Sequence, residues 1–199
     1  MSALIDFYFD FSSPYGYLAS QRIEALAARH GRTVNWRPIL LGVAFKATGM
    51  APLPQVPMKG PYSLRDFPRS ARFHGIAYRQ PSAFPIPTQA AARAFYWLQG
   101  KDGKRAVELA QALYKAYFVE DLNISEAENV VRVAVSVGCE ADGVRAALND
   151  PAVKERTKAA VDAAIAKGVF GSPYIVVDGE PFWGMDRLDQ VERWLQKPF

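Results

Sequence analysis

The hydrophobic pattern of the first 38 residues predicts a β-α-β unit. Residues 4–10 are dominated by apolar and aromatic side chains, as in a buried strand, and residues 15–26 carry apolar side chains at helical spacing. Residues 33–37 have the composition of a second strand, which Pro38 should end because proline cannot donate to a sheet ladder. Strands joined in this way pair in parallel through a right-handed crossover. We therefore expect both strands in one sheet.

The pattern then changes to a long region without strand features. Residues 42–61 are rich in proline and glycine, which predicts a long loop, and long ordered loops are often functional. Helical patterns follow for the rest of this region. Helices are predicted over residues 62–73, 103–118, 142–148 and 152–167, and from the cap residues Thr88 and Ser125.

Strand patterns return near the end of the chain. Residues 174–177 and 180–183 are predicted strands, and the Asp178-Gly179 pair between them is typical of a tight hairpin turn. Pro181 places the second strand at a sheet edge or makes its first residue irregular. Residues 187–196 have a helical pattern. The order β-α-β, helical block, β-β-α resembles the thioredoxin-like layout, an α/β fold, with a large all-helical insertion. Residues 1–40 and 168–199 would form the thioredoxin-like domain, and residues 41–167 the insertion.

Composition and charge narrow the function classes. The 199 residues are half apolar and carry a net charge of +4, which favours small anionic ligands but is too diffuse to predict nucleic-acid binding. There is no pattern of a secretory signal, and no apolar run approaches the roughly 18 residues that span a membrane. The single cysteine, Cys139, allows no internal disulfide and favours a cytoplasmic location. His30 and His74 lack metal-ligand spacing, so we expect no metal.

The stretch Ser13-Pro14-Tyr15-Gly16 joins the first predicted strand to the first helix. Ser13 is a good N-cap, and Pro14 suits the first helical turn. The N-terminus of a helix presents free backbone N–H groups and the positive end of the helix dipole. This stretch is therefore either an ordinary cap or a place that holds an anion.

Several segments resemble one family in their order along the chain. Thiol–disulfide oxidoreductases of the thioredoxin-like fold carry C-x-x-C where this chain has Ser13-Pro14-Tyr15-Gly16, so both sulfurs are absent. The chain is most similar to the 2-hydroxychromene-2-carboxylate isomerases and the related kappa-class glutathione transferases. The matching segments are residues 9–15 (Phe-Asp-Phe-Ser-Ser-Pro-Tyr), 41–49, 168–173, 177–179 and 182–188.

The resemblance implies a binding site for the thiol end of glutathione. Ser13 would hydrogen-bond the glutathione sulfur, and together with the helix N-terminus it would lower the pKa of that thiol. Ser13 would then activate a thiolate that comes from the cofactor. Ser172 and Pro173 would form a cis-proline turn, whose backbone pairs with the cysteinyl residue of glutathione like an added strand. An ordinary turn before a strand is the simpler interpretation of this pair.

The resemblance also implies partners for the two ends of glutathione. Asp186 would take the ammonium group of the γ-glutamyl residue, with the carboxylate near Arg187, although Asp186 could equally cap a helix. Lys59 would approach the glycine carboxylate or the substrate, although most lysines are simply solvated. Met50 stands where many relatives have an asparagine, and it cannot supply the hydrogen bonds of an amide.

These expectations lead to one main functional hypothesis with two rivals. The main hypothesis is a glutathione-dependent isomerase of an aromatic carboxylate, acting by reversible thiolate addition, ring opening and cis/trans isomerisation. The rivals are a kappa-like transferase or peroxidase, and a thiol-binding scaffold without turnover. Disulfide exchange is disfavoured because the resolving sulfur is missing. A homodimer is implied by the resemblance alone.

Overall fold

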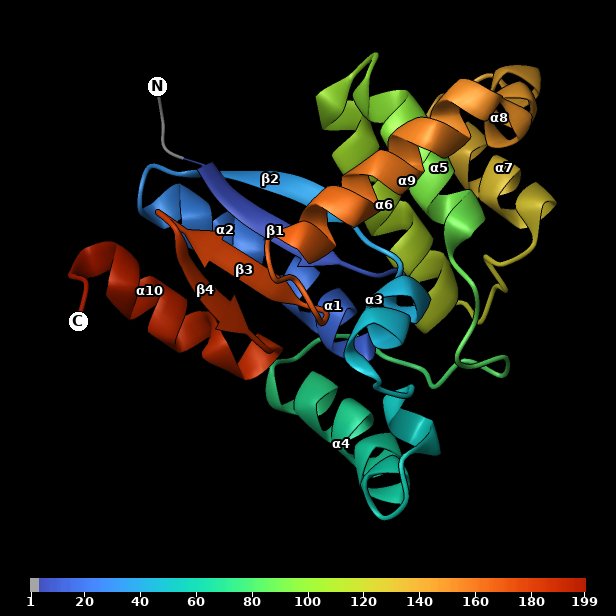
Figure 1. Ribbon diagram of the computed structural model, residues 1–199. Coiled ribbons are helices and arrows are strands. Elements are labelled where there is room, and N and C mark those ends of the chain that lie inside the picture. Colours follow the sequence, from blue (N-terminus) through green and yellow to red (C-terminus); the bar gives the residue numbers. More distant parts are fainter. Residues whose placement is uncertain (1–3) are drawn as a thin grey trace.

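The computed structural model describes residues 4–199, which fold around a four-stranded sheet (Figure 1). The strands are β1 (Leu4–Phe9), β2 (Thr33–Pro38), β3 (Tyr174–Val177) and β4 (Glu180–Trp183), arranged in the order β2-β1-β3-β4. β1 pairs with β2 in parallel and with β3 antiparallel, and β3 pairs antiparallel with β4. The predicted α/β fold of thioredoxin-like topology with a helical insertion is confirmed.

The first predicted helix is divided into two, α1 (Pro14–Ser20) and α2 (Ile23–Arg29). The Ser20 hydroxyl donates to the Tyr17 carbonyl, which competes with the next hydrogen bond of the helix ladder. Arg22 then adopts a non-helical φ of −121° before α2 begins. The single long helix expected from the apolar spacing is therefore wrong, although both pieces pack their apolar side chains into the core.

The prediction of a loop over residues 42–61 is wrong at both ends. Helix α3 (Leu41–Thr48) occupies the first part, and α4 (Lys59–Phe73) begins before residue 62. Only the middle, with the short 3₁₀ turn η1 (Leu53–Gln55), matches the Pro-rich composition. Gly49 ends α3 in the left-handed conformation that glycine favours. The wider segment is rich in glycine and proline, but α3 forms because the Asp10 carboxylate accepts the N–H of its first residue, Leu41.

Helices α5 to α9 form a block at one end of the sheet, and α4 stands apart from them (Figure 1). They are α5 (Gln89–Gln99), α6 (Gly103–Phe118), α7 (Ala127–Ser136), α8 (Ala141–Asn149) and α9 (Pro151–Ala166). Thr88 and Ser125 precede helices as expected, but neither caps one. The Thr88 hydroxyl instead donates to the Asp10 carboxylate, and the Ser125 hydroxyl donates to the Asn123 side chain.

The core lies where the sheet meets this block. Phe9 of β1 contacts the rings of Trp36 on β2, Phe95 on α5 and Tyr114 on α6. All four side chains are almost completely buried. Aromatic contacts of this kind add about 0.5–1.5 kcal/mol each beyond burial. The end of β1 is therefore held rigidly against the block, and α1 starts from that end.

The C-terminal hairpin matches its prediction. Asp178 and Gly179 have φ values of 53° and 93°, the positive pair that a tight two-residue turn requires. Pro181 lies in β4 at the sheet edge. The final helix begins with the 3₁₀ turn η2 (Met185–Arg187), followed by α10 (Leu188–Gln196). Asp186 makes no capping hydrogen bond, so the alternative interpretation of this residue as a helix cap is wrong.

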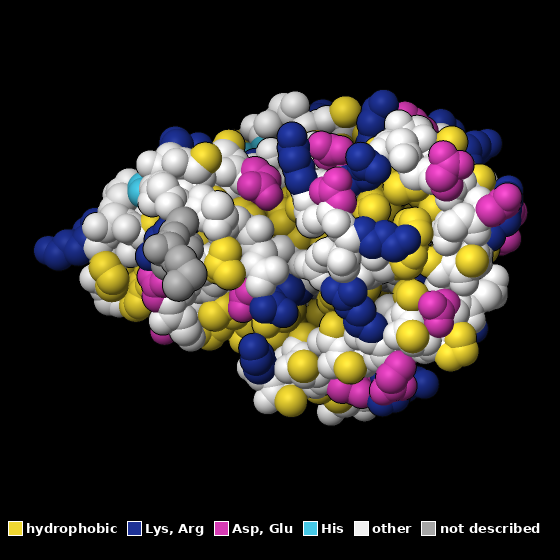
Figure 2. All heavy atoms as spheres, turned by 90° about the horizontal axis from the view of Figure 1, so that it is seen from above, with side chains coloured by type: hydrophobic (Ala, Val, Ile, Leu, Met, Phe, Trp, Pro, Cys, Tyr) yellow, Lys and Arg dark blue, Asp and Glu magenta, His cyan; other side chains and the backbone are white. Residues whose placement is uncertain are grey.

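Charged groups are mixed over the surface. On the face shown in Figure 2, Lys and Arg side chains lie among Asp, Glu and apolar side chains rather than in one basic patch, as far as the described residues go. Of the helices formed by residues 4–199, none combines the length and apolarity that a membrane crossing requires.

Candidate active site

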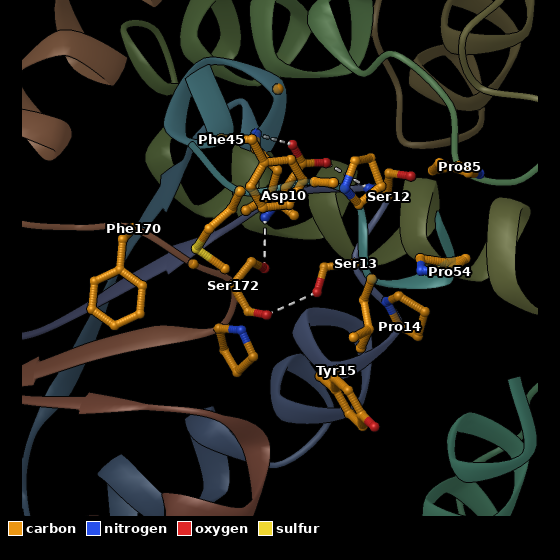
Figure 3. A pocket seen from close by; sticks show the side chains of 18 of the residues that line it. Asp10, Ser12, Ser13, Pro14, Tyr15, Phe45, Pro54, Pro85, Phe170 and Ser172 are labelled. Atoms are coloured by element: carbon orange, nitrogen blue, oxygen red, sulfur yellow. Dashed lines mark hydrogen bonds between the residues drawn. The ribbon is translucent and has the colours of Figure 1, made fainter. Parts of the chain in front are cut away.

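Every residue of the predicted site lines one cavity of about 1230 Å³, seen from close by in Figure 3. The cavity lies at the carboxyl end of β1. Its wall is formed by the start of α1, by α3, by α4 and by the segments 170–173 and 183–187. Cavities that bind small molecules measure roughly 300–1,000 Å³, so this one has room for a tripeptide and a second ligand.

Ser13 occupies the N-cap of α1 and also contacts the opposite wall. Its Oγ accepts a hydrogen bond from the Gly16 N–H at 3.0 Å and donates to the Ser172 carbonyl at 3.0 Å (Figure 3). The side chain is buried, with 5% of its surface exposed. Ser13 can therefore both cap α1 and take part in holding an anion, because the cap uses only one lone pair of the hydroxyl oxygen.

The Ser172–Pro173 peptide bond is cis. Ser172 Oγ accepts a hydrogen bond from the Asp10 N–H at 2.9 Å, and the Pro173 carbonyl accepts one from the Gly184 N–H at 3.1 Å. These bonds fix the turn to β1 on one side and to the end of β4 on the other. Gly16 allows α1 to approach it closely, because an added Cβ would lie 2.6 Å from Ser172 Oγ.

Charged residues stand at the rim of the cavity. Asp186 and Arg187 pair with each other at 3.3 Å, and their side chains are 72% and 45% exposed. Lys59, the first residue of α4, has no ion pair among residues 4–199, and Lys46 of α3 lines the same cavity. The rim thus offers a carboxylate beside a guanidinium, and separate ammonium groups.

Much of the remaining wall is apolar and aromatic. Phe170 and Trp183 meet edge to face with their ring centroids 4.9 Å apart, and the Trp183 side chain is half exposed towards the cavity. Met50 lines the cavity near the Pro-rich segment and is partly exposed. The other apolar lining residues include Phe45, Leu53, Val56, Phe67, Phe84 and Ile86.

Sequence reasoning missed two polar groups of this cavity. Asp10 is buried, and its carboxylate accepts hydrogen bonds from the backbone N–H groups of Ser12 and Leu41. Tyr15 donates to Asp66 of α4 at 2.5 Å, and burial together with this carboxylate raises the pKa of Tyr15. The sequence signal for a role of Asp10 was its position, since a carboxylate there follows a buried strand and comes just before a capped helix.

Residues 4–199 contain no group of His, Cys, Asp and Glu side chains that could hold a metal ion. Cys139 is buried in the helical block away from the cavity, and burial raises the pKa of its thiol. A thiolate at the start of α1 would therefore have to come from a bound ligand.

The fold and the cavity define a class of protein. Residues 4–196 match the DSBA-like thioredoxin domain family. The chain is 32% identical to 2-hydroxychromene-2-carboxylate isomerase of Sphingobium xenophagum, over 98% of this chain and 99% of that one. It therefore belongs to the DSBA-like thioredoxin family and, within it, to the family of the 2-hydroxychromene-2-carboxylate isomerases and their glutathione transferase relatives.

Two further comparisons agree with this assignment. Glutathione S-transferase kappa 1 of Caenorhabditis elegans is 28% identical, with 98% of this chain and 91% of that one covered. A solved structure of a 2-hydroxychromene-2-carboxylate isomerase matches with a TM-score of 0.87 and 29% identity, covering 98% of this chain and 95% of that chain. The resemblance to this family that the sequence segments indicated is confirmed.

Proposed function

We propose that this chain is a glutathione-dependent isomerase of an aromatic carboxylate, similar in activity to 2-hydroxychromene-2-carboxylate isomerase. The observation that carries the proposal is the Ser13 hydroxyl at the N-terminus of α1, facing the cis turn at Ser172–Pro173 where no cysteine is available. The isomerase and glutathione transferase relatives support it. A cytoplasmic location and a homodimer, both expected from the sequence, belong to the same proposal.

The residues present fit glutathione. The carbonyl of Ser172 is engaged by the Ser13 hydroxyl, a bond that a ligand N–H can replace without leaving either group buried and unpaired. Asp186 and Arg187 carry the charges that complement the ammonium and carboxylate of an amino acid, and both are exposed at the rim. Lys59 would hold the carboxylate at the other end. Glutathione, when bound, supplies the thiolate nucleophile that adds reversibly to the unsaturated substrate.

Ser13 has the central chemical task in this proposal. A cysteinyl N–H paired with the Ser172 carbonyl would free the Ser13 hydroxyl hydrogen to turn towards a sulfur. The Gly16 N–H still donates to Ser13 Oγ, which holds the oxygen in place and polarises its O–H bond. With the dipole of α1, this hydroxyl would stabilise negative charge at the start of the helix and so keep a bound thiol ionised.

The rest of the cavity would orient the substrate. Its apolar wall, including Phe170 and Trp183, offers aromatic edges and faces to a ring, and a ring packed against it would displace water. With Lys59 engaged by glutathione, the ammonium group of Lys46, which lines the same cavity, would attract the substrate carboxylate and the charge that develops on ring opening. Holding the reacting atoms in contact distance is worth several kcal/mol of the barrier.

The test is turnover of 2-hydroxychromene-2-carboxylate by the purified protein, with and without glutathione. We expect isomerisation that requires glutathione and is lost on dialysis. Activity with chlorodinitrobenzene and none with the chromene would favour the transferase instead. Glutathione binding without either activity would favour a scaffold, and no glutathione binding at all would overturn the proposal.

A further inference from the structure

Asp10 is a buried charged residue of the cavity that makes several hydrogen bonds with both its side chain and its main chain. It follows β1 directly and leaves only 3% of its surface exposed. Its Oδ1 accepts the Ser12 N–H at 2.7 Å and the Thr88 hydroxyl at 3.1 Å, and its Oδ2 accepts the Leu41 N–H at 2.7 Å. Burial raises the pKa of this carboxyl, and the hydrogen bonds from Leu41, Ser12 and Thr88 oppose that effect.

The main chain of Asp10 holds the thiol end of the cavity. Its N–H donates to Ser172 Oγ at 2.9 Å, and its carbonyl accepts the Ser13 N–H at 2.9 Å and the Tyr114 hydroxyl at 3.0 Å. Ser13 and Ser172, which are hydrogen-bonded to each other beside the proposed thiolate position, are thus both bonded to the backbone of one residue.

The side chain of Asp10 holds a different wall. Leu41 is the first residue of α3, whose own N-cap residue, Leu40, has no side chain that could cap it. The Asp10 carboxylate takes over this role from the end of β1, and a negative charge there is also favoured by the dipole of α3. α3 contributes Phe45 and Lys46 to the lining of the cavity.

We propose that Asp10 is a positioning residue that keeps the two halves of the cavity in register. Its main chain holds the thiol end, and its carboxylate holds α3, which presents Phe45 and Lys46 to the substrate. This inference rests on the proposed function for the identity of the two ligands. The hydrogen bonds themselves do not depend on it. Asp10 touches neither ligand in this role. Because its bonds to Ser13 and Ser172 come from the main chain, a substitution of the side chain should act mainly on the α3 half.

The experiment uses Asp10→Asn, which keeps the size of the side chain. The amide oxygen can still accept from Ser12 and Thr88, but the NH₂ group faces the Leu41 N–H, so that two donors oppose each other. Three quantities are measured: the KM for 2-hydroxychromene-2-carboxylate, the Kd for glutathione by calorimetry, and the hydrogen exchange of the backbone amides in the first turn of α3.

Two matched variants control for general destabilisation. Asp6→Asn alters a carboxylate on β1 that bonds Asn35 and Arg37 and lies outside the cavity. Thr88→Val removes one partner of Asp10 but leaves the Leu41 bond. For Asp10→Asn we expect a KM raised about tenfold, as loss of one charged hydrogen bond allows, faster exchange in α3, and a glutathione Kd within about twofold of the wild type. Asp6→Asn should change none of the three, and Thr88→Val should change KM less.

Several results would overturn the proposal. Equal changes of KM and glutathione Kd would show a general loss of structure, and unchanged exchange at the start of α3 would show that Asp10 does not hold this helix. A fall in kcat alone would place Asp10 in another role. If the wild type bound no glutathione, the proposed function would fail, while the exchange comparison would still decide whether Asp10 holds α3.

Discussion

The first turn of α1 offers a sharp prediction, because Gly16 leaves no room for a side chain. A Cβ at this position would lie 2.6 Å from Ser172 Oγ and 2.8 Å from the Tyr114 hydroxyl oxygen. Both oxygens are held by hydrogen bonds to the backbone of Asp10. Gly16→Ala must therefore push α1 away from the cis turn or break these bonds.

The magnitude follows from opposing effects. Alanine in place of glycine gains at most about 1 kcal/mol of helix propensity. Overpacking of a tight contact costs about 1–3 kcal/mol, and each weakened hydrogen bond costs about 1 kcal/mol. We expect Gly16→Ala to lower the free energy of unfolding by about 1–3 kcal/mol, measured by urea denaturation, and to weaken glutathione binding in calorimetric titration.

A matched control is Gly143→Ala in α8. There an added Cβ would meet its nearest neighbour, an atom of the Trp97 ring, at an ordinary 3.7 Å. This variant should gain about 0.5–1 kcal/mol of stability and bind glutathione like the wild type. If Gly16→Ala were as stable as Gly143→Ala and bound glutathione normally, the close approach of α1 to the turn would have no function.

Two further substitutions test the fold and the specificity. Arg32 donates hydrogen bonds of 2.9 and 2.5 Å to Asp178, and these bonds lower the pKa of the Asp178 carboxyl. The stability that this pair adds to the fold is therefore present above the unfolded pKa of about 3.9. It is lost as the pH falls through the folded pKa. Asp178→Asn, which tolerates the φ of 53°, should therefore lose about 0.5 kcal/mol at pH 7 in urea denaturation and nothing near pH 2; an equal loss at both pH values would contradict this. Met50→Asn adds an amide to the apolar wall. The ratio of kcat/KM for ring-hydroxylated substrates to kcat/KM for unsubstituted substrates should then rise severalfold. An unchanged ratio would show that Met50 does not contribute to specificity.

The fold was predictable from the sequence because its strands carry local patterns. The apolar run before Ser13 and the Asp178-Gly179 turn each specify their element without distant contacts. Helix α3 was not predictable in this way, since its N-terminus is satisfied by Asp10, 31 residues earlier in the chain. Thr88 shows the same limit, because its hydroxyl bonds Asp10 instead of the helix that it precedes.

The candidate site was identified from segments that resemble a family, and the structure adds how they meet. Pairing of β1 with β3 brings Ser13 next to Ser172, 159 residues away, which no local pattern encodes. The direction of the Ser13 hydroxyl towards the Ser172 carbonyl was also not foreseen. It matters for mechanism, since the hydroxyl has to change partners before it can stabilise a thiolate.

The thiol pKa of bound glutathione, followed by thiolate absorbance during a pH titration, tests the role of Ser13 most directly. A hydroxyl that donates to a thiolate is worth about 1.5–3 kcal/mol, or about one to two pKa units. Ser13→Ala also removes the cap of α1, so Asp102→Ala, which removes the cap of α6 away from the cavity, serves as the control. We expect Ser13→Ala to raise the pKa of the bound thiol by at least about one unit and Asp102→Ala to leave it unchanged. An equal thiol pKa in Ser13→Ala and the wild type would show that Ser13 does not activate the sulfur.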